Sequence, residues 1–209
     1  MRIFNVRLVR GLVLGVALGG GILGCGSGED SGLSSALGAS IPPGVEQPGA
    51  DVTLGCEEAR FFRLINLYRV ANGKSGLAVS KLATEAARWH AQDMGEQGYF
   101  SHTDSKGRGP QQRLADFGFN STSGENIAAG NRQASATFCQ WKNSAGHNRN
   151  MLEASFAVIG IGRAEVSGSM YGAYWSTPFG WAGDDSTTAP SIRENERATC
   201  TLPSALPAC

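Results

Sequence analysis

The chain contains three histidines, His90, His102 and His147, and these are the side chains best suited to chemistry. His102 follows Tyr-Phe-Ser and precedes a turn-like run, whereas His147 lies in the polar stretch Ala-Gly-His-Asn-Arg-Asn-Met. Glu125 adds a carboxylate within Gly-Glu-Asn-Ile-Ala. Zinc accepts imidazole nitrogen and carboxylate oxygen, and its catalytic sites commonly combine three protein ligands with a water. His102, Glu125 and His147 are therefore candidates for a metal site or for acid–base catalysis.

The spacing of these residues leaves their chemistry open. No two of them have the short helical separation of H-E-x-x-H, and we expect them on three separate loops. Ser101 and Ser144 lie near histidines, but the G-x-S-x-G motif of a serine nucleophile does not occur. Purely structural roles fit the polar runs equally well, and His90, inside a predicted helix, is interpreted as structural. We single out no residue as catalytic.

The spacing of apolar residues predicts the helices around these side chains. Apolar residues at intervals of three and four predict an amphipathic helix over residues 57–72, with Gly73 as its C-terminal stop. A second helix is predicted from the N-cap Ser80 to Gln97, where Gly98 ends it.

The rest of the predicted domain changes from helix to strand. Pro110 suits the first turn of a short third helix that Gly118 closes, and Ser135 is the predicted cap of a fourth. Residues 156–166 are rich in β-branched side chains and residues 170–179 in aromatic ones, so we expect two strands. Helices that precede strands indicate an α+β fold rather than alternating βαβ units.

Composition limits the classes of protein that need to be considered. The chain has 209 residues, of which 41 % are hydrophobic, so it can form an ordinary core. Acidic and basic residues balance at 18 each. This balance argues against a nucleic-acid partner, because proteins that bind nucleic acid through bulk charge carry clustered excess Lys and Arg.

The N-terminus has the features of an export signal. Three arginines precede residues 11–23, which are only apolar residues and glycine and are shorter than the ~20 residues of a membrane span. We interpret residues 1–24 as a signal peptide of the lipoprotein type, because the run before Cys25 resembles a bacterial lipobox. The resemblance implies lipidation of Cys25 and an exported protein anchored to a membrane of the cell envelope. The alternative is plain secretion, with Cys25 lost along with the signal.

The remaining chain divides into three parts. Residues 25–55, rich in Gly, Ser and Pro, read as a flexible tether, residues 56–180 as the folded domain and residues 181–209 as an irregular C-terminal tail.

Four further cysteines, an even number in an exported chain, indicate disulfides: Cys56, Cys139, Cys200 and Cys209. Four cysteines allow three pairings. We predict Cys56–Cys139 and Cys200–Cys209, since the second bond would close a short loop with two prolines. The alternative is that one or more of them stays reduced and buried.

Several short segments occur in a characteristic order: N-x-x-R at 66–69, A-x-D-M at 91–94, G-Y-F-S-H at 98–102, R-L-A-D-F-G at 113–118, G-E-N-I-A at 124–128, W-K-N-S-A-G-H-x-x-N-M at 141–151 and I-G-I-G at 159–162. This set resembles the CAP superfamily (SCP domains) of cysteine-rich secretory, antigen 5 and pathogenesis-related-1 proteins, in particular its bacterial exported branch. The resemblance covers about residues 57–180. It implies an α-β-α sandwich with a small central antiparallel sheet and a central cleft.

The resemblance also implies roles for individual residues. Eukaryotic members line the cleft with two His and two Glu: His102 and His147 match the histidines, and Glu125 matches the first Glu. Ser144 stands at the position of the second Glu, as is common in bacterial members, so one candidate base is missing. In some members the two histidines bind Zn²⁺ or another divalent ion, which implies a labile site with Glu125 orienting an imidazole or holding a metal-bound water.

The expected function is that of a surface-tethered binding module, whose cleft takes a lipid, glycan or protein ligand with or without a divalent metal. One alternative is a metal-assisted hydrolase with Glu125 as base. Another is a structural envelope protein with a vestigial cleft.

Overall fold

A computed structural model describes residues 52–182, 187–188 and 190–209 of the chain. The predicted signal peptide, Cys25 and most of the predicted tether lie outside these residues. In chain order the elements are β1 (Thr53–Leu54), α1 (Cys56–Ala71), β2 (Ala78–Ser80), α2 (Lys81–Gln97), α3 (Pro110–Asp116), β3 (Thr122–Ala129), α4 (Ala134–Lys142), α5 (Ala145–Leu152), β4 (Val158–Ile159), β5 (Gly162–Glu165), β6 (Ala173–Gly180), β7 (Thr187–Thr188), β8 (Ser191–Ile192) and α6 (Glu194–Arg197).

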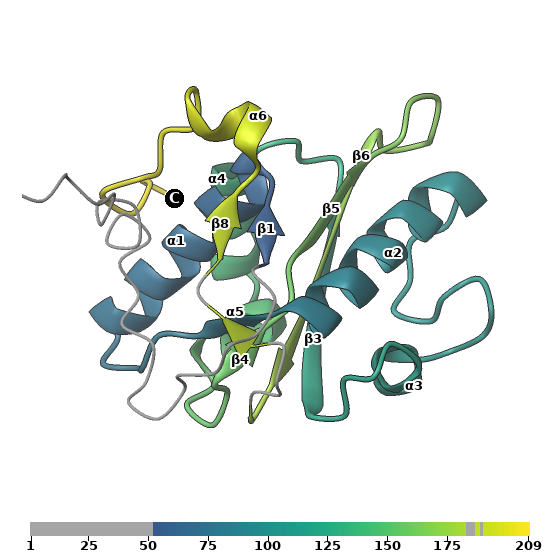
Figure 1. Ribbon diagram of the computed structural model, residues 1–209, viewed down its shortest axis with the longest axis horizontal. Helices are drawn as coiled ribbons and strands as arrows, with labels where there is room; N and C mark the ends of the chain where they lie inside the picture. The colour runs from purple at the N-terminus through teal and green to yellow at the C-terminus, as the bar shows by residue number, and fades with distance from the viewer. Residues whose placement is uncertain (1–51, 183–186, 189) are drawn as a thin grey trace, which may run out of the picture. The chain divides into compact units, whose positions relative to one another are not determined.

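The central sheet has the order β3-β6-β4-β2-β7, with β5 also paired to β6. All of its pairings are antiparallel except that of β2 with β4. Figure 1 shows α2 and α3 on one face of this sheet and α1, α4 and α5 on the other. The α+β sandwich with a small, mainly antiparallel sheet that the sequence predicts is confirmed.

The predicted ends of α2 are confirmed, because residues next to the helix cap it at both ends. Ser80 is the N-cap of α2, and its Oγ accepts a hydrogen bond from the backbone N–H of Ala83 at 3.2 Å. Gly98 ends α2 with a left-handed φ of +70°. The predicted cap Ser135 is wrong, because the N-cap of α4 is Gln133, two residues earlier. The Glu57 carboxylate of α1 accepts from the backbone N–H of Ala134 at 2.6 Å and so caps α4 from outside.

Two glycines allow the sheet and α2 to approach closely. A Cβ atom at Gly160 would lie 2.4 Å from the carbonyl oxygen of Ala83, and one at Gly162 would lie 2.1 Å from the backbone of Ala87. No larger residue fits there, so the I-G-I-G motif is explained by contact between two backbones. The predicted strand 156–166 is divided into β4 and β5, with Gly160 in the break and Gly162 as the first residue of β5.

The ends of the described chain are tied to the fold. Val52 and Leu54 are buried, and β1 pairs in parallel with β8. The folded domain therefore begins a few residues before the predicted tether ends at residue 55. Residues 181–209, expected as an irregular tail, include β7, β8 and α6.

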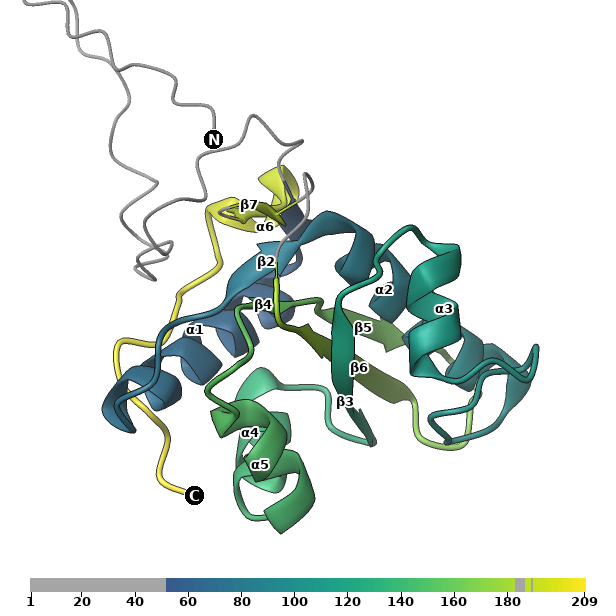
Figure 2. The same ribbon diagram turned by 90° about the horizontal axis from the view of Figure 1, so that it is seen from below.

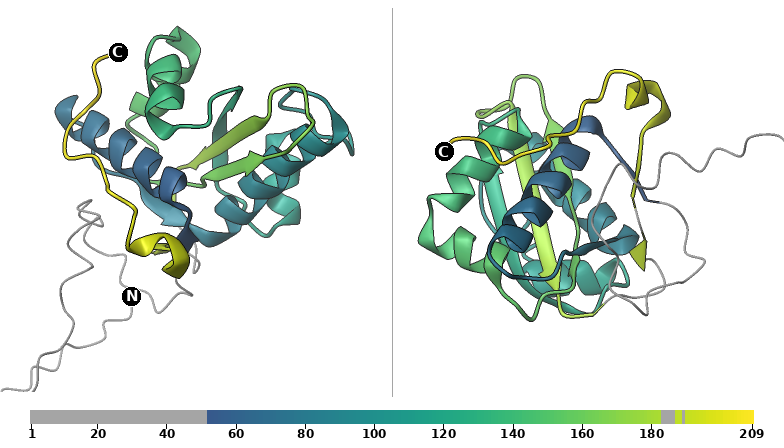
Figure 3. Two further views of the ribbon diagram at one scale, coloured as in Figure 1. Left: turned by 90° about the horizontal axis from the view of Figure 1, so that it is seen from above. Right: turned by 90° about the vertical axis from the view of Figure 1, so that its left-hand side faces the viewer.

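The disulfides link this C-terminal tail to two helices. Cys56 at the start of α1 is bonded to Cys200, and Cys139 of α4 is bonded to Cys209. The predicted pairing is therefore wrong. The tail does not bend back on itself but follows α1, where Arg60 donates from Nε to the carbonyl of Thr201 at 2.9 Å. Figure 3 shows this course along α1.

Among the residues that the structure describes, no helix combines the length and the apolar character that a membrane span needs.

Candidate functional site

Glu125 lies at the centre of the candidate site, on the edge strand β3. Its carboxylate is buried, with 2 % of the side chain exposed. Oε1 lies 2.8 Å from Nδ1 of His102, and Oε2 accepts from Nη2 of Arg113 at 2.5 Å and from Oγ of Ser176 at 3.0 Å. Burial alone raises the pKa of Glu125, but the bond from His102 and the charge of Arg113 outweigh it and hold that pKa below its ordinary value. Glu125 is therefore ionised at neutral pH and can only accept hydrogen bonds.

His102 lies between α2 and α3, on the segment that approaches Glu125. Because the Glu125 carboxylate can only accept, Nδ1 of His102 carries the proton and donates to Oε1. In a neutral ring the lone pair is then on Nε2, and 51 % of this side chain is exposed. Nε2 is therefore the nitrogen of His102 that the carboxylate leaves available.

His147 lies in the first turn of α5, which is not the loop expected from its polar sequence. Its Nδ1 is 2.9 Å from Oγ of Ser144, and its ring tilts against Trp141 with 6.0 Å between centroids. Burial, and secondarily the charge of His102, lower the pKa of His147. The imidazole is therefore neutral at pH 7.

Two asparagines connect the helix of His147 to the strand of Glu125. Asn126 donates from Nδ2 to the carbonyl of His147 at 3.0 Å, and Asn150 donates to Oδ1 of Asn126 at 2.9 Å. Figure 2 shows α3 and α5 on either side of β3. His102, Glu125 and His147 are thus brought to one strand, although Glu125 lies on β3 and not on the predicted loop.

Ser144, at the position of the missing second Glu, is the N-cap residue of α5 but makes no side-chain capping bond. Its hydroxyl is instead directed to the His147 ring. A neutral hydrogen-bonding group thus replaces a carboxylate beside the second imidazole.

An open pocket of about 480 Å³ lies against this site, lined by His102, Gly109, Pro110, Gln111, Gln112, Gly124 and Glu125. Its walls come from the start of α3 and from β3 and are mostly polar in residue type. His147 is not among the lining residues. No group of three or more His, Cys, Asp or Glu side chains placed to hold a metal occurs among the described residues.

Two residues of this network were missed by the sequence interpretation: Arg113 and Ser176. The only signal was physical, since a buried Glu needs a partner. The partner itself could not be named, because Arg113 comes from α3 and Ser176 from β6.

The third histidine, His90, is fully buried on α2. Its Nδ1 lies 3.4 Å from the hydroxyl of Tyr99, and its Nε2 has no hydrogen-bond partner among the described residues. Burial lowers the pKa of His90 to about 4. These surroundings fit the structural role expected for His90.

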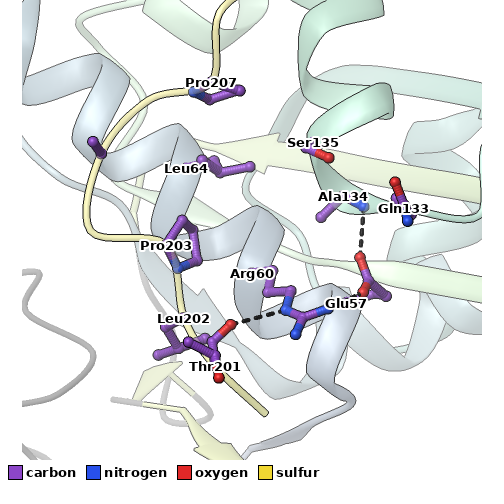
Figure 4. Close-up of a pocket in the computed structure, with 11 residues that line it drawn as sticks. Glu57, Arg60, Leu64, Gln133, Ala134, Ser135, Thr201, Leu202, Pro203 and Pro207 are labelled. Atoms are coloured by element: carbon purple, nitrogen blue, oxygen red, sulfur yellow. Dashed lines mark hydrogen bonds and ion pairs between the residues drawn. The ribbon is translucent and has the colours of Figure 1, made fainter.

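A second pocket, of about 320 Å³, lies between α1, the start of α4 and the C-terminal tail. Figure 4 shows that Glu57 and Arg60 face it beside Leu64, Leu202 and Pro203. No histidine lines it, so it is separate in chemistry from the Glu125 site.

Comparison with known proteins assigns the domain. The model of the cysteine-rich secretory protein (CAP) family matches residues 62–179. The protein YkwD of Bacillus subtilis (strain 168) is 32 % identical over 123 residues, which are 58 % of this chain and 48 % of YkwD. The membrane protein YlbC of the same strain is 33 % identical over 109 residues, which are 50 % of this chain and 31 % of YlbC. The chain thus spans half or less of these relatives.

Two solved structures are similar to the fold. An extracellular protein of Bacillus anthracis str. Ames that contains an SCP domain has 28 % identity and a TM-score of 0.52, over 58 % of this chain and 39 % of that one. An outer surface protein of Borrelia burgdorferi has 20 % identity and a TM-score of 0.55, over 63 % of this chain and 97 % of that one, and supports the fold alone. With more than half of its residues matched by the family model, the chain belongs to the cysteine-rich secretory protein (CAP) family.

Proposed function

We propose that this protein is an exported CAP-domain binding module. Its cleft binds a divalent metal through His102 and His147, and Zn²⁺ is the first ion to test. The observation that carries this proposal is the state of the two imidazoles. In each ring Nδ1 already has an oxygen partner from the chain, Glu125 or Ser144, and when Nδ1 donates to that oxygen the lone pair of Nε2 remains for a metal. Histidine ligands of metals are commonly held through their other nitrogen in this way.

The donor set fits a weak, exchangeable site. Two imidazoles are fewer protein ligands than the four of a structural zinc site. A bound divalent ion supplies a positive anchoring point for oxygen atoms of a lipid, glycan or protein ligand. The pocket beside His102 offers room for such a ligand.

Binding is favoured over hydrolysis by the surroundings of Glu125. Both of its carboxylate oxygens are engaged, one by His102 and the other by Arg113 and Ser176. Oε1 keeps one lone pair, but only 2 % of the side chain is exposed, so the carboxylate has little access to a proton that a general base would remove. Ser144 also stands where a second carboxylate would be required, so the hydrolase is the weaker alternative.

Calorimetric titration of Zn²⁺ into the chain downstream of the signal peptide tests the proposal. We expect measurable binding at neutral pH that falls at least about tenfold in His102→Ala and in His147→Ala, because each variant removes a direct ligand. Gln111→Ala, on the rim of the same pocket, is the matched control and should bind as the wild type does. Absence of zinc binding by the wild type refutes the metal site and favours the vestigial cleft.

Export and anchoring are supported by the N-terminal sequence, by two disulfides and by the similarity to an extracellular protein of Bacillus anthracis. We expect the mature protein to begin at a lipidated Cys25, which holds it at a membrane of the cell envelope. Mass spectrometry of the mature N-terminus checks this. An unmodified terminus at any other residue would sink the lipid anchor and leave plain secretion.

A further inference from the structure

We infer that Arg113 is a positioning residue that fixes which nitrogen of His102 faces the cleft. This inference rests on the proposed function, because it concerns how the first imidazole is prepared for a metal. Arg113 is almost completely buried, with 1 % of its side chain exposed. It does not border the pocket but lies behind Glu125 and His102.

The guanidinium of Arg113 holds both partners of one hydrogen bond. Nη2 donates to Oε2 of Glu125 at 2.5 Å, and Nη1 donates to the backbone carbonyl of His102 at 3.1 Å. One rigid fork therefore sets the carboxylate and the main chain of the histidine relative to each other. The ammonium of a lysine is a single point and has no such planar fork, so it cannot fix the two acceptors in this geometry.

The orientation of Glu125 follows from this contact. Arg113 and Ser176 both donate to Oε2, which directs the other oxygen, Oε1, at Nδ1 of His102. Whenever the ring is neutral, its proton is then held on Nδ1 and its lone pair stays on Nε2. Without Arg113 a buried carboxylate would lose the cation that balances its charge, a costly arrangement that forces it to move or to admit water. Either change releases Nδ1 of His102.

Arg113→Lys is the decisive variant, with Ala115→Ser on the exposed side of α3 as its matched control. The first readout is the imidazole nitrogen spectrum of the metal-free protein at about pH 8, where an ordinary imidazole is neutral. We expect His102 to hold its proton on Nδ1 in the wild type and in Ala115→Ser, and to become a mixture of tautomers in Arg113→Lys. The second readout is zinc affinity, which should fall about tenfold or more in Arg113→Lys, as is usual when a partner of a metal ligand is lost.

A fall in zinc affinity with an unchanged His102 tautomer would overturn the inference, because it would show a general structural role. An unchanged affinity and an unchanged tautomer would overturn it as well. If Arg113→Lys does not fold, Ser176→Ala replaces it, since that variant removes another donor to Oε2 and is expected to shift the tautomer in the same direction. If the wild type binds no zinc, the proposed function fails, and the spectrum of the metal-free protein still decides whether Arg113 fixes His102.

Discussion

Three histidines of this chain have different roles because their surroundings differ. His102 is half exposed and donates to an ionised carboxylate, whereas His147 pairs with a hydroxyl and lies against Trp141. His90 is buried without a charged partner in direct contact. The sequence already set His90 apart by its place in a predicted helix, and burial and hydrogen bonding now distinguish all three imidazoles.

His90 should make the stability of the protein dependent on pH. Burial lowers its pKa from 6.5 to about 4, so between these values the unfolded chain binds more protons than the folded one. The free energy of unfolding therefore falls as the pH is lowered from 6.5 to about 4, by roughly 3 kcal/mol for this group at about 1.4 kcal/mol per pKa unit. Denaturant unfolding across this range should show a flatter pH profile for His90→Gln than for the wild type. Parallel pH profiles of the wild type and His90→Gln would contradict this account. Because both proteins contain the same carboxylates, the difference between the two profiles reports His90.

At the scale of elements, the helices with strong local signals were predicted and two elements of the site were not. The helix α2 has a Ser cap, an apolar stripe and a Gly stop, all within its own sequence. By contrast, α5 buries only Met151 in full and is held by side-chain hydrogen bonds from other elements. In β3 the residues 125–128 are all buried, so the strand lacks the alternation that predicts one.

The C-terminal tail is an element whose stability depends on covalent links. Its two bonds close sequence separations of 144 residues for Cys56–Cys200 and 70 for Cys139–Cys209. We expect the double variant Cys56→Ser/Cys200→Ser to lower the free energy of unfolding by about 2–4 kcal/mol, because it frees a long loop in the unfolded chain.

The matched double variant Cys139→Ser/Cys209→Ser should lower the free energy of unfolding by a smaller amount. It mainly releases the last residues of the tail, while Cys200 stays bonded to Cys56. Denaturant unfolding shows which double variant loses more free energy of unfolding, and limited proteolysis shows release of the tail. The reverse order would mean that the end of the tail carries more of the stability than its contacts indicate.

At the scale of the whole molecule, the ordered motifs predicted the fold class and the residues of the candidate site. They predicted neither the disulfide pairing nor the ends of the domain, since residues 52–54 meet the tail through the pairing of β1 with β8. A pairing between such distant segments leaves no periodic trace in either of them.

Local patterns and motif order were enough to predict the family, the main helices and a candidate set formed by His102, Glu125, His147 and Ser144. The assembled fold was needed to show that Arg113 and Ser176 hold the Glu125 carboxylate and that Ser144 contacts the His147 imidazole. A buried charge must find its partners in space, and the partners of Glu125 come from three different parts of the chain. The orientation of each imidazole is therefore a property of the assembled fold.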